Sequence, residues 1–93
     1  MKGINQLLIQ AQNAYNEGNL EKVMEILQDE RFDNNIQALF LKGEAFYKLQ
    51  EWGEALNCFS VCLEKDPQNV QVKSYIEMIQ NILGFHYKDF FNP

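Results

Sequence analysis

Apolar residues recur along the chain at spacings of three and four rather than two. Leu7, Ala11 and Ala14 show this spacing near the N-terminus, and it returns at Leu39 and Gly43. Such spacing places side chains on one face of an α-helix, whereas a half-buried strand would alternate with a period of two. The pattern therefore predicts an all-α fold.

Turn-forming and capping residues divide this pattern into five predicted helices. The helices are expected at residues 4–16, 20–29, 36–49, 52–65 and 69–83. Gly18 can adopt the left-handed conformation that closes a helix, and Pro67 lacks the amide donor needed to continue one. Asn19 is suited to cap the second helix, and Asp33 and Asn34 are cap candidates for the third.

The sequence also contains an internal repeat. Shifting it by 32 residues aligns apolar positions of similar size, namely Leu7 with Leu39, Leu8 with Phe40, Ala11 with Gly43, Tyr15 with Tyr47, Leu20 with Trp52, Val23 with Ala55 and Leu27 with Phe59. A recurring unit of this length is typical of a helix hairpin. We therefore divide the single domain into a repeat at 4–35, a repeat at 36–69, a capping helix at 69–83 and an aromatic tail at 84–93.

The second unit resembles the tetratricopeptide repeat (TPR). It carries the apolar, small and aromatic residues of that repeat at Leu39, Gly43, Phe46, Trp52, Ala55, Phe59 and Cys62, and the closing proline at Pro67. The first unit matches less well, with Ala14 where an aromatic residue is usual and Val23 in place of a small one. Glu77 falls at the small position of the third unit, which favours a cap. The resemblance implies antiparallel hairpins stacked as a short right-handed α-solenoid of about two TPR units plus a C-terminal capping helix.

The resemblance further implies a function, because such arrays bind a peptide or partner protein in a concave groove lined by the first helix of each repeat. The expected groove residues are Asn5, Leu8, Gln12, Asn16, Gln37, Phe40, Glu44, Tyr47, Lys48, Gln71, Ser74, Tyr75 and Met78. Leu8 and Phe40 would anchor apolar side chains of the partner, and the amides would bond its backbone. The lysine, arginine and asparagine residues with which some TPR domains bind a C-terminal carboxylate are missing here, because other residues stand at the matching positions, namely Leu8, Gln12, Phe40 and Glu44. We therefore expect a non-catalytic scaffold for protein binding.

Charge and composition narrow the partner class. Eight basic against thirteen acidic residues give a net charge of -5, and the basic residues are scattered singly from Lys2 to Lys88. Nucleic-acid binding needs a clustered basic face, so we expect no nucleic-acid partner. We expect no membrane partner because no apolar run approaches 18 residues. The absence of an export signal favours a cytoplasmic location and two cysteines that remain thiols.

A few residues could carry chemistry, although each has a structural interpretation. Cys58 and Cys62 with His86, the single histidine, could form a nucleophile and base or three metal ligands. A reactive thiol needs an electropositive setting and zinc usually takes four ligands, and neither condition is met. Glutamates at every fourth position from Glu17 to Glu25 follow one helix face and are typical of a solvated surface. We therefore expect no catalysis, no cofactor and no metal.

The fifth helix carries two apolar stripes, one at Val72, Ile76, Ile79 and Leu83 and another at Tyr75, Met78 and Ile82. One stripe suffices to pack on the preceding hairpin, so the second needs a cover. The aromatic residues in 84–93 are one candidate cover, and a partner surface, either another copy of the chain or a different protein, is the other. The alternative function is thus a self-associating structural module, and the chain is expected to be a monomer or a weak homodimer.

Overall fold

The computed structural model describes residues 3–91 of the chain and the side chains of residues 3–84. Its helices are α1 (Ile4–Asn16), α2 (Leu20–Leu27), α3 (Ile36–Lys48), α4 (Trp52–Lys65) and α5 (Val70–Phe91), with a short 3-10 helix, η1 (Glu30–Phe32), between α2 and α3. No strand occurs within residues 3–91. The predicted all-α fold is confirmed.

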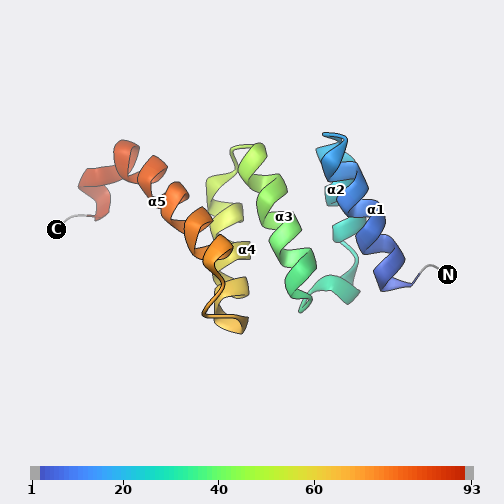
Figure 1. Cartoon of the computed structure of the whole chain (residues 1–93). Coiled ribbons are helices and arrows are strands. Elements are labelled where there is room, and N and C mark those ends of the chain that lie inside the picture. Colours follow the sequence, from blue (N-terminus) through green and yellow to red (C-terminus); the bar gives the residue numbers. More distant parts are fainter. Residues whose placement is uncertain (1–2, 92–93) are drawn as a thin grey trace.

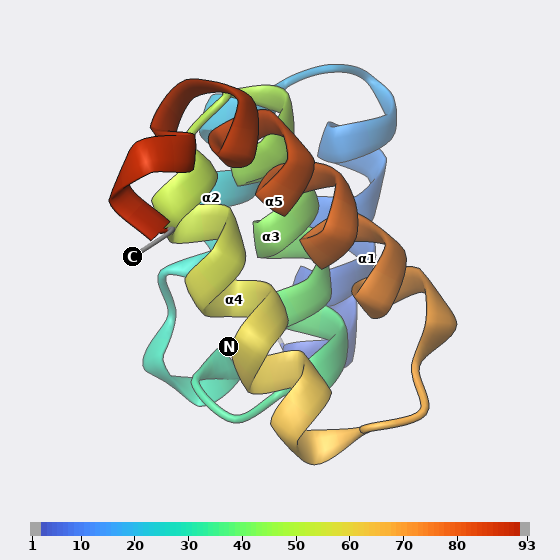
Figure 2. The ribbon, with the colours of Figure 1, turned by 90° about the vertical axis from the view of Figure 1, so that its left-hand side faces the viewer.

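The helices form a stack of hairpins that runs from one end of the molecule to the other (Figure 1). α1 packs against α2 and α3 against α4, and the hairpins are joined by contacts of α2 with α3 and of α4 with α5. Seen from the end, α1, α3 and α5 lie on one side and α2 and α4 on the other (Figure 2). This arrangement is the helix-hairpin solenoid that the repeat predicted.

The two repeats share the same turn after their first helix. The N–H groups of Gly18 and Asn19 donate to carbonyls of α1 at 3.0 and 2.8 Å, and those of Gln50 and Glu51 donate to carbonyls of α3 at 3.0 and 2.9 Å. This pair of hydrogen bonds satisfies the last carbonyl groups of a helix and requires one residue in the left-handed conformation. Gly18 has φ 80° as expected, and Gln50, at the equivalent position, has φ 62°.

Asparagine side chains begin three of the helices. Asn19, Asn35 and Asn69 each accept a hydrogen bond from the N–H three residues later, at 3.2, 2.9 and 3.0 Å. The prediction was therefore right at Asn19 and wrong at Asp33 and Asn34. The reason is the short helix η1. Asp33 is the C-terminal cap of η1, and α3 begins only after Asn35, which caps it.

A single ring joins α3, α4 and α5. Phe59 of α4 is fully buried, and its ring lies directly against Gly43 of α3. A methyl group at Gly43 would lie only 2.7 Å from Cε1 and 2.8 Å from Cζ of that ring. Tyr75 of α5 stacks on Phe59 with centroids 4.7 Å apart and planes 11° apart, and Phe40 meets it edge-on at 5.8 Å. The small residue at 43 is thus required by an aromatic ring.

α5 packs through both of its apolar stripes. Val72 and Ile79 of the first stripe are fully buried against α4, as expected. Tyr75 of the second stripe needs no separate cover, because it stacks on Phe59; this corrects the expectation of a wholly unpartnered stripe. Met78 of that stripe stays substantially exposed.

The C-terminal limit of α5 differs from the prediction. The helix was expected to end near residue 83 and continues to Phe91. A lone glycine at 84 weakens a helix by about 1 kcal/mol but does not end it, and no proline follows until the last residue. The predicted covering of α5 by the aromatic tail concerns side chains outside the described residues.

Replacing Gly43 with alanine tests the ring contact. A Cβ atom at this position would overpack a buried ring, at a cost of about 1 to 3 kcal/mol. That exceeds the gain of about 1 kcal/mol in helix propensity, so Gly43→Ala should lower the free energy of unfolding. Gly53→Ala is the control, because Gly53 is helical and no atom would meet its Cβ within 4 Å. Chemical denaturation should show destabilisation for the first variant only.

The shared helix-closing turn predicts that substitutions at its two equivalent positions, Gly18 and Gln50, change the stability in opposite directions. Left-handed backbone costs a non-glycine residue about 1 to 2 kcal/mol. Gln50→Gly should therefore stabilise the protein by about 0.5 to 1 kcal/mol, after the larger chain entropy of glycine is subtracted. Gly18→Ala should destabilise it by about 1 kcal/mol. Thermal unfolding measures both, and shifts of the same sign would contradict the shared turn.

Candidate functional site

A cleft of about 560 Å³ opens on the side of the molecule formed by the first helices of the repeats. It lies between α1 and α3 and reaches the start of α5. Its lining residues are Asn5, Leu8, Ile9, Gln12, Ile36, Gln37, Phe40, Leu41, Glu44, Asn69 and Gln71. The lining alternates apolar side chains with carboxamides, so it offers both an apolar surface and hydrogen-bonding groups to a bound segment.

Seven predicted groove residues line this cleft together: Asn5, Leu8, Gln12, Gln37, Phe40, Glu44 and Gln71. They come from three helices that are distant in sequence. Their spacing of three or four along α1 and α3 turns them toward the same space.

The prediction omitted four lining residues, namely Ile9, Ile36, Leu41 and Asn69. Ile9 is 60% exposed, so it adds apolar surface at the mouth of the cleft. Ile9 directly follows the predicted groove residue Leu8. It would have been included if the prediction had also counted the neighbours of each groove residue in sequence. Asn69 was missed because it serves first as the cap of α5.

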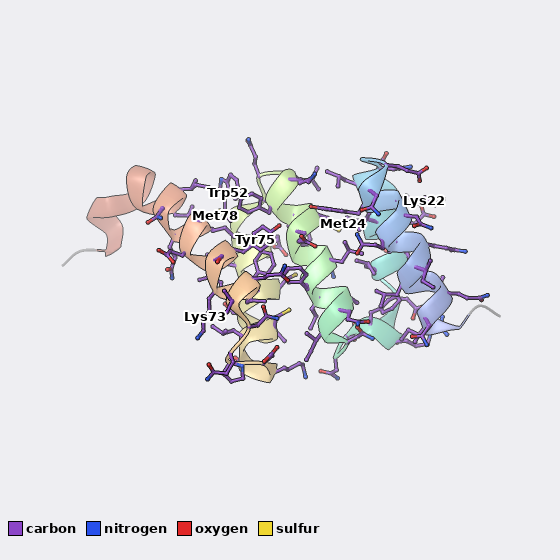
Figure 3. All side chains as sticks on the ribbon, viewed as in Figure 1. Lys22, Met24, Trp52, Lys73, Tyr75 and Met78 are labelled. Carbon is purple, nitrogen blue, oxygen red and sulfur yellow. The ribbon has the colours of Figure 1, made fainter. Side chains whose placement is uncertain are left out.

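Six predicted residues lie outside the cleft lining: Asn16, Tyr47, Lys48, Ser74, Tyr75 and Met78. Several are engaged with neighbouring helices. The Lys48 ammonium lies 4.9 Å from the centre of the Tyr15 ring, and the Tyr47 hydroxyl lies 3.9 Å from the sulfur of Met78. Figure 3 shows Tyr75 and Met78 on α5, on the side of that helix that faces α3. Lys48 thus contacts α1 from α3, and Tyr47 and Met78 connect α3 with α5 beside the cleft.

One hydrogen bond ties the cleft to α5. The Tyr75 hydroxyl donates to Oε2 of Glu44 at 2.9 Å, which joins α5 to α3. Partial burial raises the pKa of Glu44 above its usual value, although the bond from Tyr75 and the charge of Lys48 act in the opposite direction. The pKa of Tyr75 is also raised, first by burial and then by its bond to the Glu44 carboxylate. Glu44 thus holds a partly desolvated charge at one end of the cleft.

The two thiols lie on α4 and do not line the cleft. Cys58 and Cys62 are buried on α4 and are free. Burial raises the pKa of both thiols, that of Cys62 to about 11, so both stay protonated at neutral pH. Protonated thiols are poor nucleophiles and poor metal ligands. The side chain of His86, their proposed partner, lies outside the described residues.

Two kinds of feature are absent from the part of the chain that the structure describes, namely a metal-binding cluster and a membrane-spanning helix. No group of three or more histidine, cysteine, aspartate or glutamate side chains in this part could hold a metal ion. Within the same residues, no helix combines the length and the apolar character that crossing a bilayer requires.

Comparison with known proteins identifies one family. The family described as anaphase-promoting complex, cyclosome, subunit 3 matches residues 1–62, which is two-thirds of the chain. The match spans α1, α2, α3 and most of α4, and therefore most of both hairpins and of the cleft. No solved structure matches the chain.

The half-buried carboxylate of Glu44 predicts a pH-dependent effect on stability. Because its pKa is raised in the folded state, its contribution to stability is present at low pH and lost as the pH rises through the folded pKa. Glu44→Gln can still accept the bond from Tyr75 and does not titrate. The variant should therefore unfold at a higher temperature than the wild type at pH 7, and this advantage should shrink toward pH 4.

Thermal unfolding across this pH range provides the measurement. Glu54→Gln removes the same charge from an exposed position on α4 and controls for the change in net charge. A difference between Glu44→Gln and the wild type that stays constant with pH would contradict the interpretation.

Proposed function

The chain belongs to the family of anaphase-promoting complex, cyclosome, subunit 3, whose repeats are of the TPR type, and we propose that it is a non-catalytic module that binds a peptide segment of a partner protein in its cleft. Repeats of this type generally act as scaffolds for protein interaction. The observation that carries the proposal is the position of the cleft, which opens between first helices of successive repeats and mixes apolar with amide side chains.

The chemistry of the lining supports protein as the ligand class. Leu8, Ile9 and Phe40 offer apolar contacts to a partner's side chain, and burial of such contacts supplies most binding free energy at interfaces. Gln37 and Gln71 are exposed amides that can both donate to and accept from main-chain groups. The free thiols of Cys58 and Cys62 are compatible with a reducing compartment, which supports a cytoplasmic location for this binding.

Substitutions at the mouth of the cleft test the proposal. Ile9→Ser combined with Gln37→Ala removes one exposed apolar side chain and one exposed amide from the lining without changing the net charge. Loss of these contacts should weaken capture of a partner about tenfold, equivalent to about 1.4 kcal/mol. Partners are identified by mass spectrometry after affinity capture, and circular dichroism verifies the fold of each variant.

The matched control is Leu49→Ser combined with Asn57→Ala. Both residues are exposed and lie outside the cleft lining, so the control makes the same kinds of change elsewhere. The proposal requires partners that the control retains and the cleft variant loses. Equal capture by both variants would show that the cleft is not the binding site.

A further inference from the structure

The lining of the cleft is almost uncharged. Among its lining residues, Glu44 is the one ionisable side chain, and no lysine or arginine contributes. Lys48 lies one turn further along α3, outside the lining, with its ammonium over the ring of Tyr15. The one ionisable group in the lining that a ligand would meet is therefore the half-buried carboxylate of Glu44, whose charge the nearby Lys48 partly offsets.

The hydrogen bonds of the Glu44 carboxylate determine which groups of a ligand it can bind. A carboxylate only accepts hydrogen bonds and does so at both oxygens. Tyr75 donates to Oε2 at 2.9 Å, which leaves acceptor capacity on the group. Partial burial has already removed part of its hydration, so a donor from a ligand would replace lost water contacts. A second carboxylate at this place would instead add like-charge repulsion in a partly desolvated setting.

The spacing along α3 matches the spacing of an extended peptide. Glu44 follows Phe40 by one helical turn, which is about 6 Å along the axis. In an extended chain, residues two apart point to the same side and lie about 6.6 Å apart. A segment whose apolar side chain rests on Leu8 and Phe40 can therefore present the side chain two residues away to Glu44.

We propose that the cleft selects an extended segment that carries a bulky apolar side chain and, two residues away, a hydrogen-bond donor instead of a carboxylate. This inference rests on the proposed function and adds the chemistry of the partner. Glu44 acts as the selecting residue, because it attracts a donor and repels an acid at a fixed distance from the apolar anchor. Tyr75 orients the carboxylate from α5.

Two isosteric peptides test this selection. The probes are acetyl-Ser-Asn-Ser-Leu-Ser-Asn-Ser-amide and the same peptide with aspartate at both asparagine positions. The caps remove the terminal charges, and the symmetric design places the variable residue two positions from leucine in either binding direction. Backbone amide shifts of isotope-labelled protein give both the affinity and the location of binding.

In the wild type, the asparagine peptide should shift resonances of α1 and α3 and bind about tenfold more tightly than the aspartate peptide. Glu44→Gln should reduce this difference to less than about twofold, because the amide no longer repels an acid. Glu54→Gln, which makes the same change of net charge on α4, should leave the difference intact.

The remaining outcomes overturn the inference. Equal affinities in the wild type, or a difference that persists in Glu44→Gln, would show that Glu44 does not select. Failure of both peptides to shift cleft resonances at millimolar concentration would show that the proposed segment is the wrong ligand. None of these results decides the proposed function, which depends on partner capture by the Ile9 and Gln37 variant.

Discussion

The ring of Phe59, seated against Gly43, is the contact on which the C-terminal half of the solenoid depends. It fixes the distance between α3 and α4, and its face provides the surface on which Tyr75 of α5 stacks. Through that stack, the Tyr75 hydroxyl reaches Glu44, which lines the cleft. A core contact between α3 and α4 is therefore connected, through Tyr75, to a charged group that lines the cleft.

The sequence predicted those parts of the fold that depend on local patterns. Helix periodicity placed four of the five helices within two residues of their observed limits. The left-handed conformation at Gly18 was predictable because glycine adopts it without steric cost. The left-handed conformation of Gln50 was not predictable from its residue type, because glutamine seldom adopts it. Only the repeat alignment relates Gln50 to Gly18. The end of α5 was misjudged because a glycine weakens a helix without ending it.

The parts of the cleft that depend on local helix patterns were predictable as well. Positions such as Leu8, Gln12 and Phe40 follow from helix geometry and the repeat alignment. Tyr75 was a predicted groove residue, and its ring stacks on Phe59 outside the cleft lining; this placement depends on aromatic contacts between residues distant in sequence. Single-helix patterns do not specify such contacts, because they depend on how two packed surfaces fit together.

Glu44 shows how the core and the cleft are connected. If its purpose were only to hold the Tyr75 hydroxyl, a glutamine would accept the same hydrogen bond without a desolvated charge. The carboxylate is therefore a structural cost at neutral pH, consistent with its raised pKa. Functional sites are where a folded chain retains groups that lower its stability. Glu44 lies one helical turn from Phe40 in the lining of the cleft, and the proposed selection of a hydrogen-bond donor would give this charge a role that packing alone does not explain.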